Sequence, residues 1–328
     1  YMEQSAVRDG VTAEEVKGIL LGMASGQETL LGYFRRFIRN FEKRVGINRT
    51  VGSLRAYSNA YSHIERFLQA QYKLSDIPFS ALDRSFIDKY DLYLRTERNL
   101  APGTIINLTV QLKTIVGEAI ADGIITASPF MGYEPVRPKH VQKYLTAEEL
   151  HRIMTTPLHR QTLYHVRDMF LFSCFTGIPY GDMRLLTKDN LCLAEDGIWW
   201  IKSARQKTKI EFEIPLLDLP LQILKKYSGT APGDKLLPMY CNSTLNLYLK
   251  EIARICHIDR PLVFHAGRHT YATEITLSHG VPLETVSRML GHSQIETTQI
   301  YAKVTDEKID ADTKALNRKI SERFSVVI

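Results

Sequence analysis

The sequence is poor in cysteine and contains no long hydrophobic run. Its four cysteines, at positions 174, 192, 241 and 256, include no pair at the Cys-x-x-Cys spacing. A disulfide framework or structural zinc site is therefore not expected, and a reducing cytoplasm fits best. No apolar stretch approaches the roughly 20 residues that a membrane-spanning helix needs. The first ten residues also lack the apolar part of a signal peptide, so we expect neither secretion nor a membrane location.

A strong excess of one charge is absent too, although the balance is basic. Lysine and arginine total 42 and aspartate and glutamate 36, which gives a formal net charge of +6. Such a mild excess permits nucleic-acid binding without requiring it. Hydrophobic residues make up 44% of the 328 residues, which excludes an intrinsically disordered chain and suggests about two domains. The chain begins with tyrosine rather than methionine, as expected of a fragment or a processed form.

The first part of the chain has the periodicity of packed helices. Apolar residues recur at helical spacing from Leu30 to Val45 and from Leu54 to Leu68, and the pattern continues over residues 85–98 and 104–121. Pro102 is typical of a helix start. We therefore predict an N-terminal extension over residues 1–27 and a helical domain over residues 28–127.

Basic residues gather at two places in this half. Three lie four apart on one face of the first predicted helix, namely Arg35, Arg39 and Lys43. An ordinary solvated helix face explains them equally well. Residues 128–144 are rich in proline, which disfavours a helix, and carry Arg137, Lys139 and Lys143. This segment is predicted to be a basic linker.

The second part of the chain mixes helices and strands. Thr146 and Glu149 have the spacing of a helix-capping box, and residues 165–175 are apolar enough for a buried helix. Residues 190–215 alternate like strands, in two runs joined by the basic segment 202–209. The expected fold class is mainly α with a small antiparallel β-sheet, in a domain over residues 145–305 followed by a tail over residues 306–328.

The most informative stretch runs from residue 262 to residue 304. His265, Arg268 and His269 are three and four residues apart on a predicted helix. His292 follows an amphipathic helix at a glycine turn, and Tyr301 comes nine residues later. Arginine binds phosphate oxygens bidentately and histidine transfers protons near neutral pH, so this set suits phosphodiester chemistry without a metal. The two histidines of the first group could instead bind zinc, but no carboxylate general base stands between them.

The motifs HxxRHTYAT, LGH and TTQIYAKV resemble the C-terminal active-site block of the tyrosine recombinases, the phage integrase family. The resemblance covers roughly residues 28–320. It implies a helical core-binding, DNA-binding domain, a basic linker and a mixed α/β catalytic domain. It also implies a site-specific DNA recombinase that works through a 3′-phosphotyrosyl intermediate without metal, ATP or another cofactor. The implied partners are specific double-stranded DNA sites and three further copies of the chain in a homotetramer, in the bacterial cytoplasm.

The same resemblance assigns roles to single residues. Tyr301 would be the nucleophile, and Arg268 would clamp a non-bridging phosphate oxygen. His265 would be a general base or hydrogen-bonding partner, and His292 a second donor to the phosphate. The family also uses a lysine on a β-hairpin as the general acid for the leaving 5′-oxygen.

One position departs from the family pattern. Pro179 stands where the first arginine of the family is expected, and proline donates no hydrogen bond. Lys207 is the best match to the hairpin lysine, with Lys209 as the weaker alternative. We predict that Arg205 replaces the missing cation, because it would project from the same face of an extended strand as the lysine two residues later. Arg184 is the second candidate.

Several alternatives stay open from the sequence. Without a replacement cation, the protein would be a catalytically impaired DNA-binding regulator of the same fold. A type IB topoisomerase shares the chemistry, although chain size and the helical first domain favour recombination. The altered first-arginine turn resembles integrases of Bacteroides-type mobile elements, which implies the integrase of a conjugative transposon or prophage. The basic residues of the first helix and linker are then candidate DNA contacts. The tail carries an apolar set that could dock on a neighbouring protomer or on its own domain, Ile309, Leu316 and Ile320.

Overall fold

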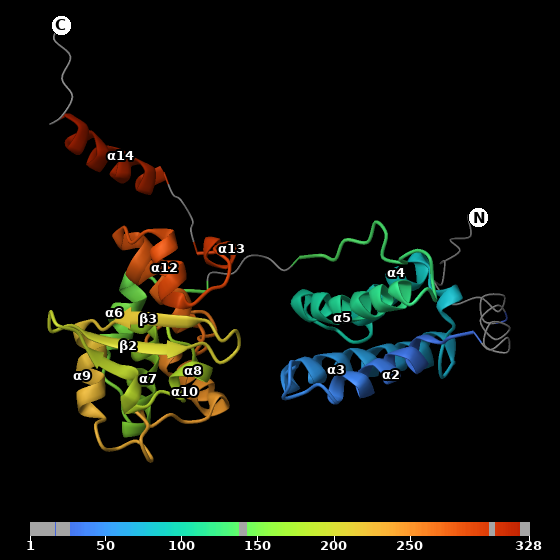
Figure 1. Ribbon diagram of the computed structural model, residues 1–328, viewed down its shortest axis with the longest axis horizontal. Helices are drawn as coiled ribbons and strands as arrows, with labels where there is room; N and C mark the ends of the chain where they lie inside the picture. The colour runs from blue at the N-terminus through green and yellow to red at the C-terminus, as the bar shows by residue number, and fades with distance from the viewer. Residues whose placement is uncertain (1–16, 18–26, 138–142, 302–305, 322–328) are drawn as a thin grey trace, which may run out of the picture. The chain divides into compact units, whose positions relative to one another are not determined.

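The computed structural model describes residues 17, 27–137, 143–301 and 306–321. The chain divides into two compact units, residues 1–140 and 141–328, and each is described by itself (Figure 1). The division falls inside the predicted linker. Most of the expected N-terminal extension and Lys139 lie outside the described residues.

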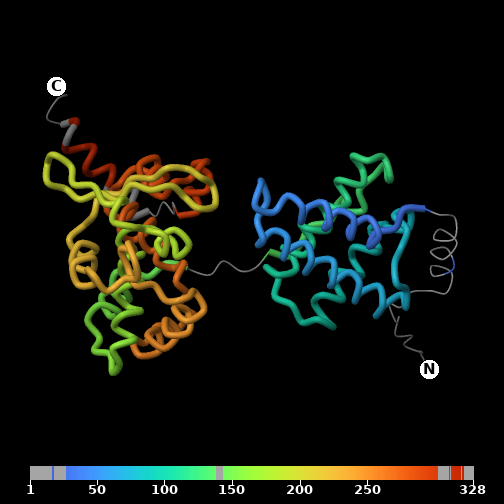
Figure 2. The backbone as a smooth tube through the Cα atoms, turned by 60° about the horizontal axis from the view of Figure 1, so that its bottom comes forward, coloured from blue at the N-terminus to red at the C-terminus, as the bar shows by residue number. Residues whose placement is uncertain are grey.

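The first unit is helical, as predicted (Figure 2). A π-helical turn, Leu68–Tyr72, continues its second helix, and a 3-10 turn at Phe79–Ala81 precedes the third. The core is aromatic: the Phe67 ring lies 5.1 Å from the Tyr90 ring and 5.3 Å from the Phe86 ring. The unit contains the helices α2 (Leu30–Glu42), α3 (Val51–Phe67), α4 (Arg84–Thr96) and α5 (Pro102–Ala121). Proline suits the first position of α5 because an amide there has no intrahelical partner.

Much of the predicted linker is anchored to one unit or the other. Phe130 is only 4% exposed and belongs to the core of the first unit. The Tyr133 hydroxyl donates to the Asp91 carboxylate at 2.7 Å. At the other end, the carbonyl of Tyr144 accepts a hydrogen bond of 2.7 Å from Arg260 in the second unit. The linker is therefore shorter than the proline-rich segment suggests.

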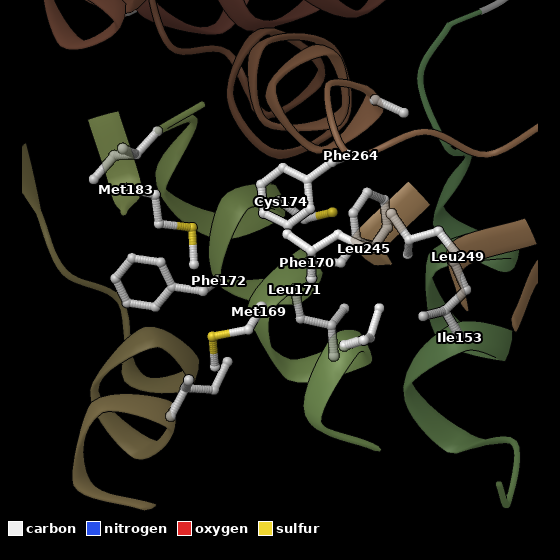
Figure 3. Close-up of a cluster of buried hydrophobic side chains, with 14 of the residues drawn as sticks. Ile153, Met169, Phe170, Leu171, Phe172, Cys174, Met183, Leu245, Leu249 and Phe264 are labelled. Atoms are coloured by element: carbon white, nitrogen blue, oxygen red, sulfur yellow. The ribbon is translucent and has the colours of Figure 1, made fainter. Parts of the chain in front are cut away.

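The second unit is built around α7, a helix that is buried over most of its surface. Met169, Phe170 and Phe172 on α7 are fully buried, and the Phe170 ring meets Phe264 edge to face (Figure 3). A helix that is apolar on all sides belongs in the centre of a core. The helices of this unit are α6 (Ala147–Thr155), α7 (Gln161–Thr176), α8 (Tyr180–Met183), α9 (Asp218–Lys226), α10 (Asn242–Ile255), α11 (Ala266–Thr270), α12 (Leu283–Leu290), α13 (Glu296–Gln299) and α14 (Asp306–Ser321). Shorter 3-10 turns lie at Lys188–Asn190 and Leu277–His279, and a π-helical turn at Tyr271–Thr276.

Two local predictions for this unit are confirmed. The capping box starts α6: the Thr146 hydroxyl accepts from the Glu149 amide at 3.3 Å, and the Glu149 carboxylate accepts from the Thr146 amide at 2.9 Å. The strand region forms an antiparallel sheet in the order β1 (Leu191–Leu193), β2 (Trp199–Ala204) and β3 (Glu211–Pro215). Strand β2 extends further than expected and pairs Ala204 with Glu211, so only residues 205–210 connect the two strands.

The tail forms α14. On this helix Leu316 is 56% exposed and Ile320 42% exposed, whereas the side chain of Ile309 is outside the described residues. None of the helices in the described ranges has the length and apolar character needed to cross a membrane.

Candidate active site

Arg268 on α11 is the centre of the site. It is 3% exposed, and its guanidinium donates to the carbonyl of Gly177 at 2.9 Å, the carbonyl of Leu290 at 2.7 Å and Nε2 of His292 at 2.8 Å. All three acceptors are neutral, and no described carboxylate forms an ion pair with this arginine. Burial and the nearby Arg205 lower its pKa to about 10, so it stays charged at neutral pH.

Two glycine turns bring these acceptors together. Gly177 ends α7 with φ +69°, and Gly291 ends α12 with φ +63°. A side chain at Gly177 would come within 2.5 Å of the Tyr271 ring, and one at Gly291 within 2.9 Å of Arg205. Both turns therefore require glycine for backbone conformation and for space. The carbonyls at helix C-termini carry partial negative charge, so they suit a buried cation.

Arg205 joins the same site from the end of β2. Its Nε lies 2.7 Å from the Asp182 carboxylate, and its Nη1 donates to the Leu290 carbonyl at 2.9 Å, the acceptor that Arg268 also uses. Asp182, on α8, is 6% exposed. Pro179, Arg205 and Arg268 line one small internal gap. The structure thus places the Arg205 side chain beside the proline that occupies the expected arginine position.

The geometric reason given for Arg205 was wrong. Residues 206–208 form a turn rather than an extended strand, so Arg205 and Lys207 do not share a strand face. Instead, Asp182 pulls Arg205 inward and accepts the amide of Gln206 at 2.8 Å. Lys207 is exposed in the turn, and Lys209 follows it with φ 60°. Among the described residues, Lys207 makes no hydrogen bond or ion pair with the rest of the site.

Arg184, the second candidate for the missing cation, does not enter the site. It caps the C-terminus of α8 and is exposed, whereas Arg205 is half-buried. Of the two candidates, only Arg205 contacts the carbonyl that also holds Arg268.

Tyr301 lies within this cluster of the same chain. It is 7% exposed, and its ring is 5.2 Å from the ring of His269 and stacks on that of His292 at 6.3 Å. Burial raises the pKa of the phenol, and the hydrogen-bonding Arg268 guanidinium opposes this rise. His265 is exposed and contacts the His269 ring at 4.9 Å, so it reaches the phenol only through that ring.

The histidines of the site are neutral at pH 7. Burial, with help from Arg268 and Arg205, lowers the pKa of His292 to about 4. Burial also lowers the pKa of His269 to about 4, with His265 and Lys143 adding to the effect. The pKa of His265 is lowered in the same direction. Burial is the largest cause in all three, and the nearby positive charges, which add to it, would favour an incoming anion.

His269 was already singled out by its spacing from His265 and Arg268, and its ring contacts that of Tyr301. The sequence did not reveal two other contributors: Asp182 orients Arg205, and the buried Thr298 lies with its hydroxyl 2.7 Å from Nδ1 of His292. A threonine three residues before the tyrosine on a helical turn was the only available signal for the last of them. Within the described ranges, no group of three or more His, Cys, Asp or Glu side chains is placed to hold a metal ion.

The candidate DNA contacts are mostly exposed and remain predictions. Arg39 and Lys43 are exposed on or beside α2, and Arg35 donates to the Tyr61 hydroxyl at 2.6 Å. Arg137 and Lys143 are exposed at the two described ends of the linker.

The chemical capacity of the site follows from its charges. Two guanidinium groups and one carboxylate lie together, and the more buried guanidinium has only neutral acceptors. A phosphate group would supply the missing negative charge and accept the hydrogen bonds that the carbonyls now receive. The phenol beside it is an oxygen nucleophile in reach of that position.

The comparisons with known proteins agree with this geometry. Residues 143–308 match the phage integrase family, and residues 29–135 match the phage integrase SAM-like domain. Tyrosine recombinase XerD of Listeria monocytogenes is 25% identical over 273 residues, covering 78% of this chain and 89% of its own. XerD of Staphylococcus saprophyticus is 26% identical over 297 residues, covering 86% of this chain and 96% of its own.

Solved structures share the fold. The Tn1549 transposon integrase in complex with transposon right end DNA has a TM-score of 0.68 at 19% identity, covering 88% of this chain and 99% of its own. A lambda integrase dimer bound to a core site also has a TM-score of 0.68 at 18% identity, covering 85% of this chain and 100% of its own. Because the family match spans the catalytic unit and a second match spans the helical unit, this chain belongs to the phage integrase family and is a tyrosine recombinase.

Proposed function

We propose that this protein is the integrase of a mobile element, a conjugative transposon or a prophage, that exchanges strands between specific DNA sites. The observation that carries this proposal is the buried Tyr301 beside Arg268, a guanidinium without a carboxylate partner. A buried cation without a carboxylate partner costs folding free energy, and we interpret this cost as tolerated because the charge binds an anion during function.

The proposed cleavage step assigns one role to each of these residues. The Tyr301 oxygen attacks the phosphorus, a bond forms between them, and the bond from phosphorus to the 5′-oxygen breaks. Arg268 and Arg205 would stabilise the negative charge that builds on the non-bridging oxygens. Lys207, exposed in the turn between β2 and β3, would donate the proton that the leaving 5′-oxygen requires. The phenol proton passes to a base, for which the neutral His265 is the proposed acceptor by way of His269, whose ring contacts both His265 and Tyr301.

Strand exchange then uses the stored phosphotyrosyl bond. The 5′-hydroxyl of a partner strand attacks the 3′-phosphotyrosyl phosphorus and releases the phenol, so neither ATP nor a metal is consumed. Two such exchanges require four protomers on two sites, and a lambda integrase tetramer bound to a Holliday junction is among the structural neighbours. The exposed Leu316 and Ile320 on α14 support docking of the tail on a neighbouring protomer.

Binding would involve both units. Basic side chains of the helical unit and of the linker would contact phosphates and position the duplex. They are Arg35, Arg39 and Lys43 on the helical unit and Arg137, Lys139 and Lys143 in the linker. The likeness to the Tn1549 transposon integrase supports a mobile element as the source of the sites.

The test is to map covalent attachment in a genomic DNA library. The protein is incubated with the library, denatured, and captured with any attached DNA, whose ends are then sequenced. We expect recovery at a discrete set of sequences and none with Tyr301→Phe, which keeps the ring but loses the nucleophile. Binding without attachment would identify a DNA-binding regulator. Attachment at scattered sites with relaxation of supercoils would identify a topoisomerase.

A further inference from the structure

His292 is hydrogen-bonded through both ring nitrogens. Its Nε2 lies 2.8 Å from an Nη2 of Arg268, and its Nδ1 lies 2.7 Å from the hydroxyl of Thr298. A guanidinium only donates, so Nε2 must accept. Because the ring is neutral at pH 7, its one proton is on Nδ1 and is donated to Thr298.

This arrangement has a consequence for the reaction. In the state described, Nε2 carries no hydrogen and cannot donate to a phosphate oxygen. When the Arg268 guanidinium donates to a phosphate instead, Nε2 of His292 no longer accepts from it. Nε2 can then be the protonated nitrogen and donate to a phosphate oxygen. The partner at Nδ1 must then suit either form of the ring. A hydroxyl can accept from a protonated Nδ1 or donate to a bare one, whereas a carbonyl or carboxylate can only accept.

Thr298 is placed to do this without help from water. It is fully buried, so a lost hydroxyl would leave Nδ1 facing a dry site. The charged and titratable groups around His292 are Arg268, Arg205 and Tyr301, and none of them contacts Nδ1 in the described structure. Thr298 is therefore the one described hydrogen-bond partner of Nδ1, and it would still hold the ring when Arg268 turns to a phosphate.

The same residue belongs to the segment that delivers the nucleophile. Thr298 lies on α13, and its carbonyl accepts the amide of Tyr301 at 2.9 Å. The hydrogen bond to His292 would therefore break if this turn moved away from the site. Movement of the tyrosine would then also change how the histidine ring is held.

We propose that Thr298 is a positioning residue for DNA cleavage, which holds the His292 ring towards the phosphate and links its orientation to docking of the Tyr301 turn. This inference rests on the proposed function, because it concerns the same reaction. It assigns no contact with DNA to Thr298 itself.

The first test compares Thr298→Val with Thr298→Ser on a nicked suicide duplex carrying a site mapped as above. Valine keeps the shape and removes the hydroxyl, so we expect cleavage to slow by roughly 10- to 100-fold, with serine close to the parent protein. The thermal unfolding midpoint of each variant is measured to exclude misfolding. Equal cleavage rates for the valine variant and the parent would overturn the proposal.

A double-mutant cycle separates positioning from general structural support. If Thr298 acts through His292, then Thr298→Val should cause little further loss in a His292→Gln background. A full, additive loss in that background would show that Thr298 acts elsewhere.

A measurement without DNA keeps this inference distinct from the proposed function. Nitrogen NMR of histidine-labelled protein should show His292 protonated on Nδ1 in the parent and in Thr298→Ser, and a changed ring signal in Thr298→Val. Absence of covalent adducts with the parent would refute the proposed integrase function. A parent His292 protonated on Nε2 in the free protein would refute the hydrogen-bond assignment itself.

Discussion

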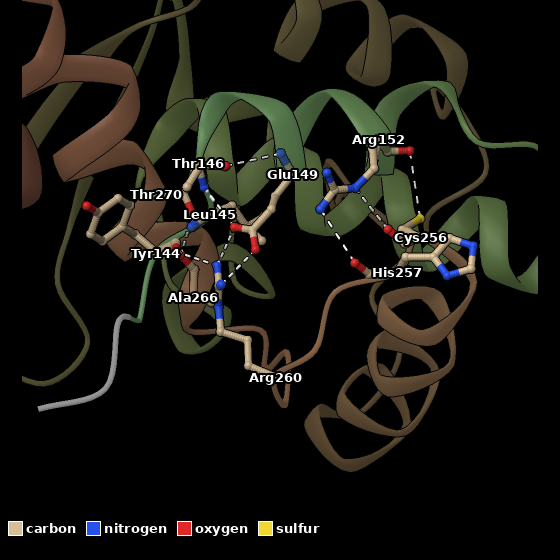
Figure 4. Close-up of polar contacts among 10 residues, drawn as sticks. All are labelled: Tyr144, Leu145, Thr146, Glu149, Arg152, Cys256, His257, Arg260, Ala266 and Thr270. Carbon is tan, nitrogen blue, oxygen red and sulfur yellow. Dashed lines mark hydrogen bonds and ion pairs between the residues drawn. The ribbon is translucent and has the colours of Figure 1, made fainter. Parts of the chain in front are cut away.

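Two arginines of the catalytic unit show how differently the same side chain can be held. Arg260 donates to both oxygens of Glu149, one of them at 2.7 Å, and to the Tyr144 carbonyl at 2.7 Å (Figure 4). Arg268 is more deeply buried but bonds two carbonyls and the imidazole of His292. The first guanidinium is neutralised within the protein, and the second is not.

The difference separates a structural arginine from one available for a ligand. In a guanidinium paired bidentately with a carboxylate, the charge is neutralised and the hydrogen-bond donors that face the carboxylate are occupied. One held by carbonyls keeps its full charge and can exchange these acceptors for a stronger anionic one. Arg205 is intermediate, since it pairs with Asp182 and also bonds the carbonyl that Arg268 uses. The comparison predicts opposite effects of substitution on stability and on cleavage.

The largest effect is expected from exchanging each of the two arginines for methionine. Arg268→Met should slow cleavage of a suicide substrate by roughly 10³-fold, because a phosphate clamp is lost. Its unfolding midpoint should hold or rise, since an unpaired buried charge is removed. Arg260→Met leaves the Glu149 carboxylate without its cationic partner, so the midpoint should fall by about 5 °C while cleavage per folded molecule stays near the parent value. Calorimetry and a gel assay for the covalent adduct measure both quantities. The reverse pattern would invalidate the distinction drawn between the two residues.

Arg205 provides the next test, with Arg184 as its matched control. Arg205→Ala should slow cleavage by roughly 10²-fold, the loss expected when one preorganised donor to the transition state is removed. Arg184→Ala, on the exposed end of α8, should stay within about twofold because a surface change away from the phosphate alters little. Single-turnover rates on the same nicked substrate measure both. If Arg205→Ala cleaved as fast as the parent protein, this residue would not replace the missing first arginine.

Local features of the fold were readable from the sequence because local chemistry determines them. The capping box at Thr146, the proline start of α5 and the alternation in β2 and β3 each depend on residues a few positions apart. The extent of the linker was misjudged, because burial of Phe130 depends on contacts with distant helices. Proline content alone does not report such contacts.

For the candidate site, the sequence predicted the residues of the family motif but not the contacts that hold them. The family pattern identified Arg268, His292 and Tyr301, and the structure brings these three together. The contacts that organise them span long stretches of chain: Gly177, whose carbonyl holds Arg268, is 91 positions away. The inward turn of Arg205 depends on Asp182, a pairing that no periodicity in the strand predicts.

A third prediction extends the comparison to Lys207, an exposed cation that has no carboxylate partner among the described residues. Lys207→Ala should slow cleavage by roughly 10²-fold if this lysine protonates the leaving 5′-oxygen. A substrate with sulfur in place of that bridging oxygen needs no such proton, because a thiol has a pKa near 8.5. The sulfur substrate should therefore restore the rate of Lys207→Ala nearly to that of the parent. Lys209→Ala is the control; rescue of that variant instead would transfer the role to the neighbouring lysine.

The smallest effect concerns His269, one of the histidines that burial and the nearby positive charges keep neutral at pH 7. The folded pKa of His269 is about 4, below its unfolded value near 6.5. Between these values the unfolded chain binds the extra proton, so the contribution of this residue to stability is full above pH 6.5 and is lost as pH falls towards 4. His269→Phe keeps a ring against Tyr301 but cannot titrate. The free energy of unfolding of both proteins is measured by urea denaturation from pH 6.5 to pH 4. Over this range the variant should lose about 1–2 kcal/mol less than the parent, after allowance for the partial exposure of His269. Above pH 7.5 the difference between the two proteins should be constant, and a constant difference down to pH 4 would mean that the folded protein protonates His269 as readily as the unfolded chain does.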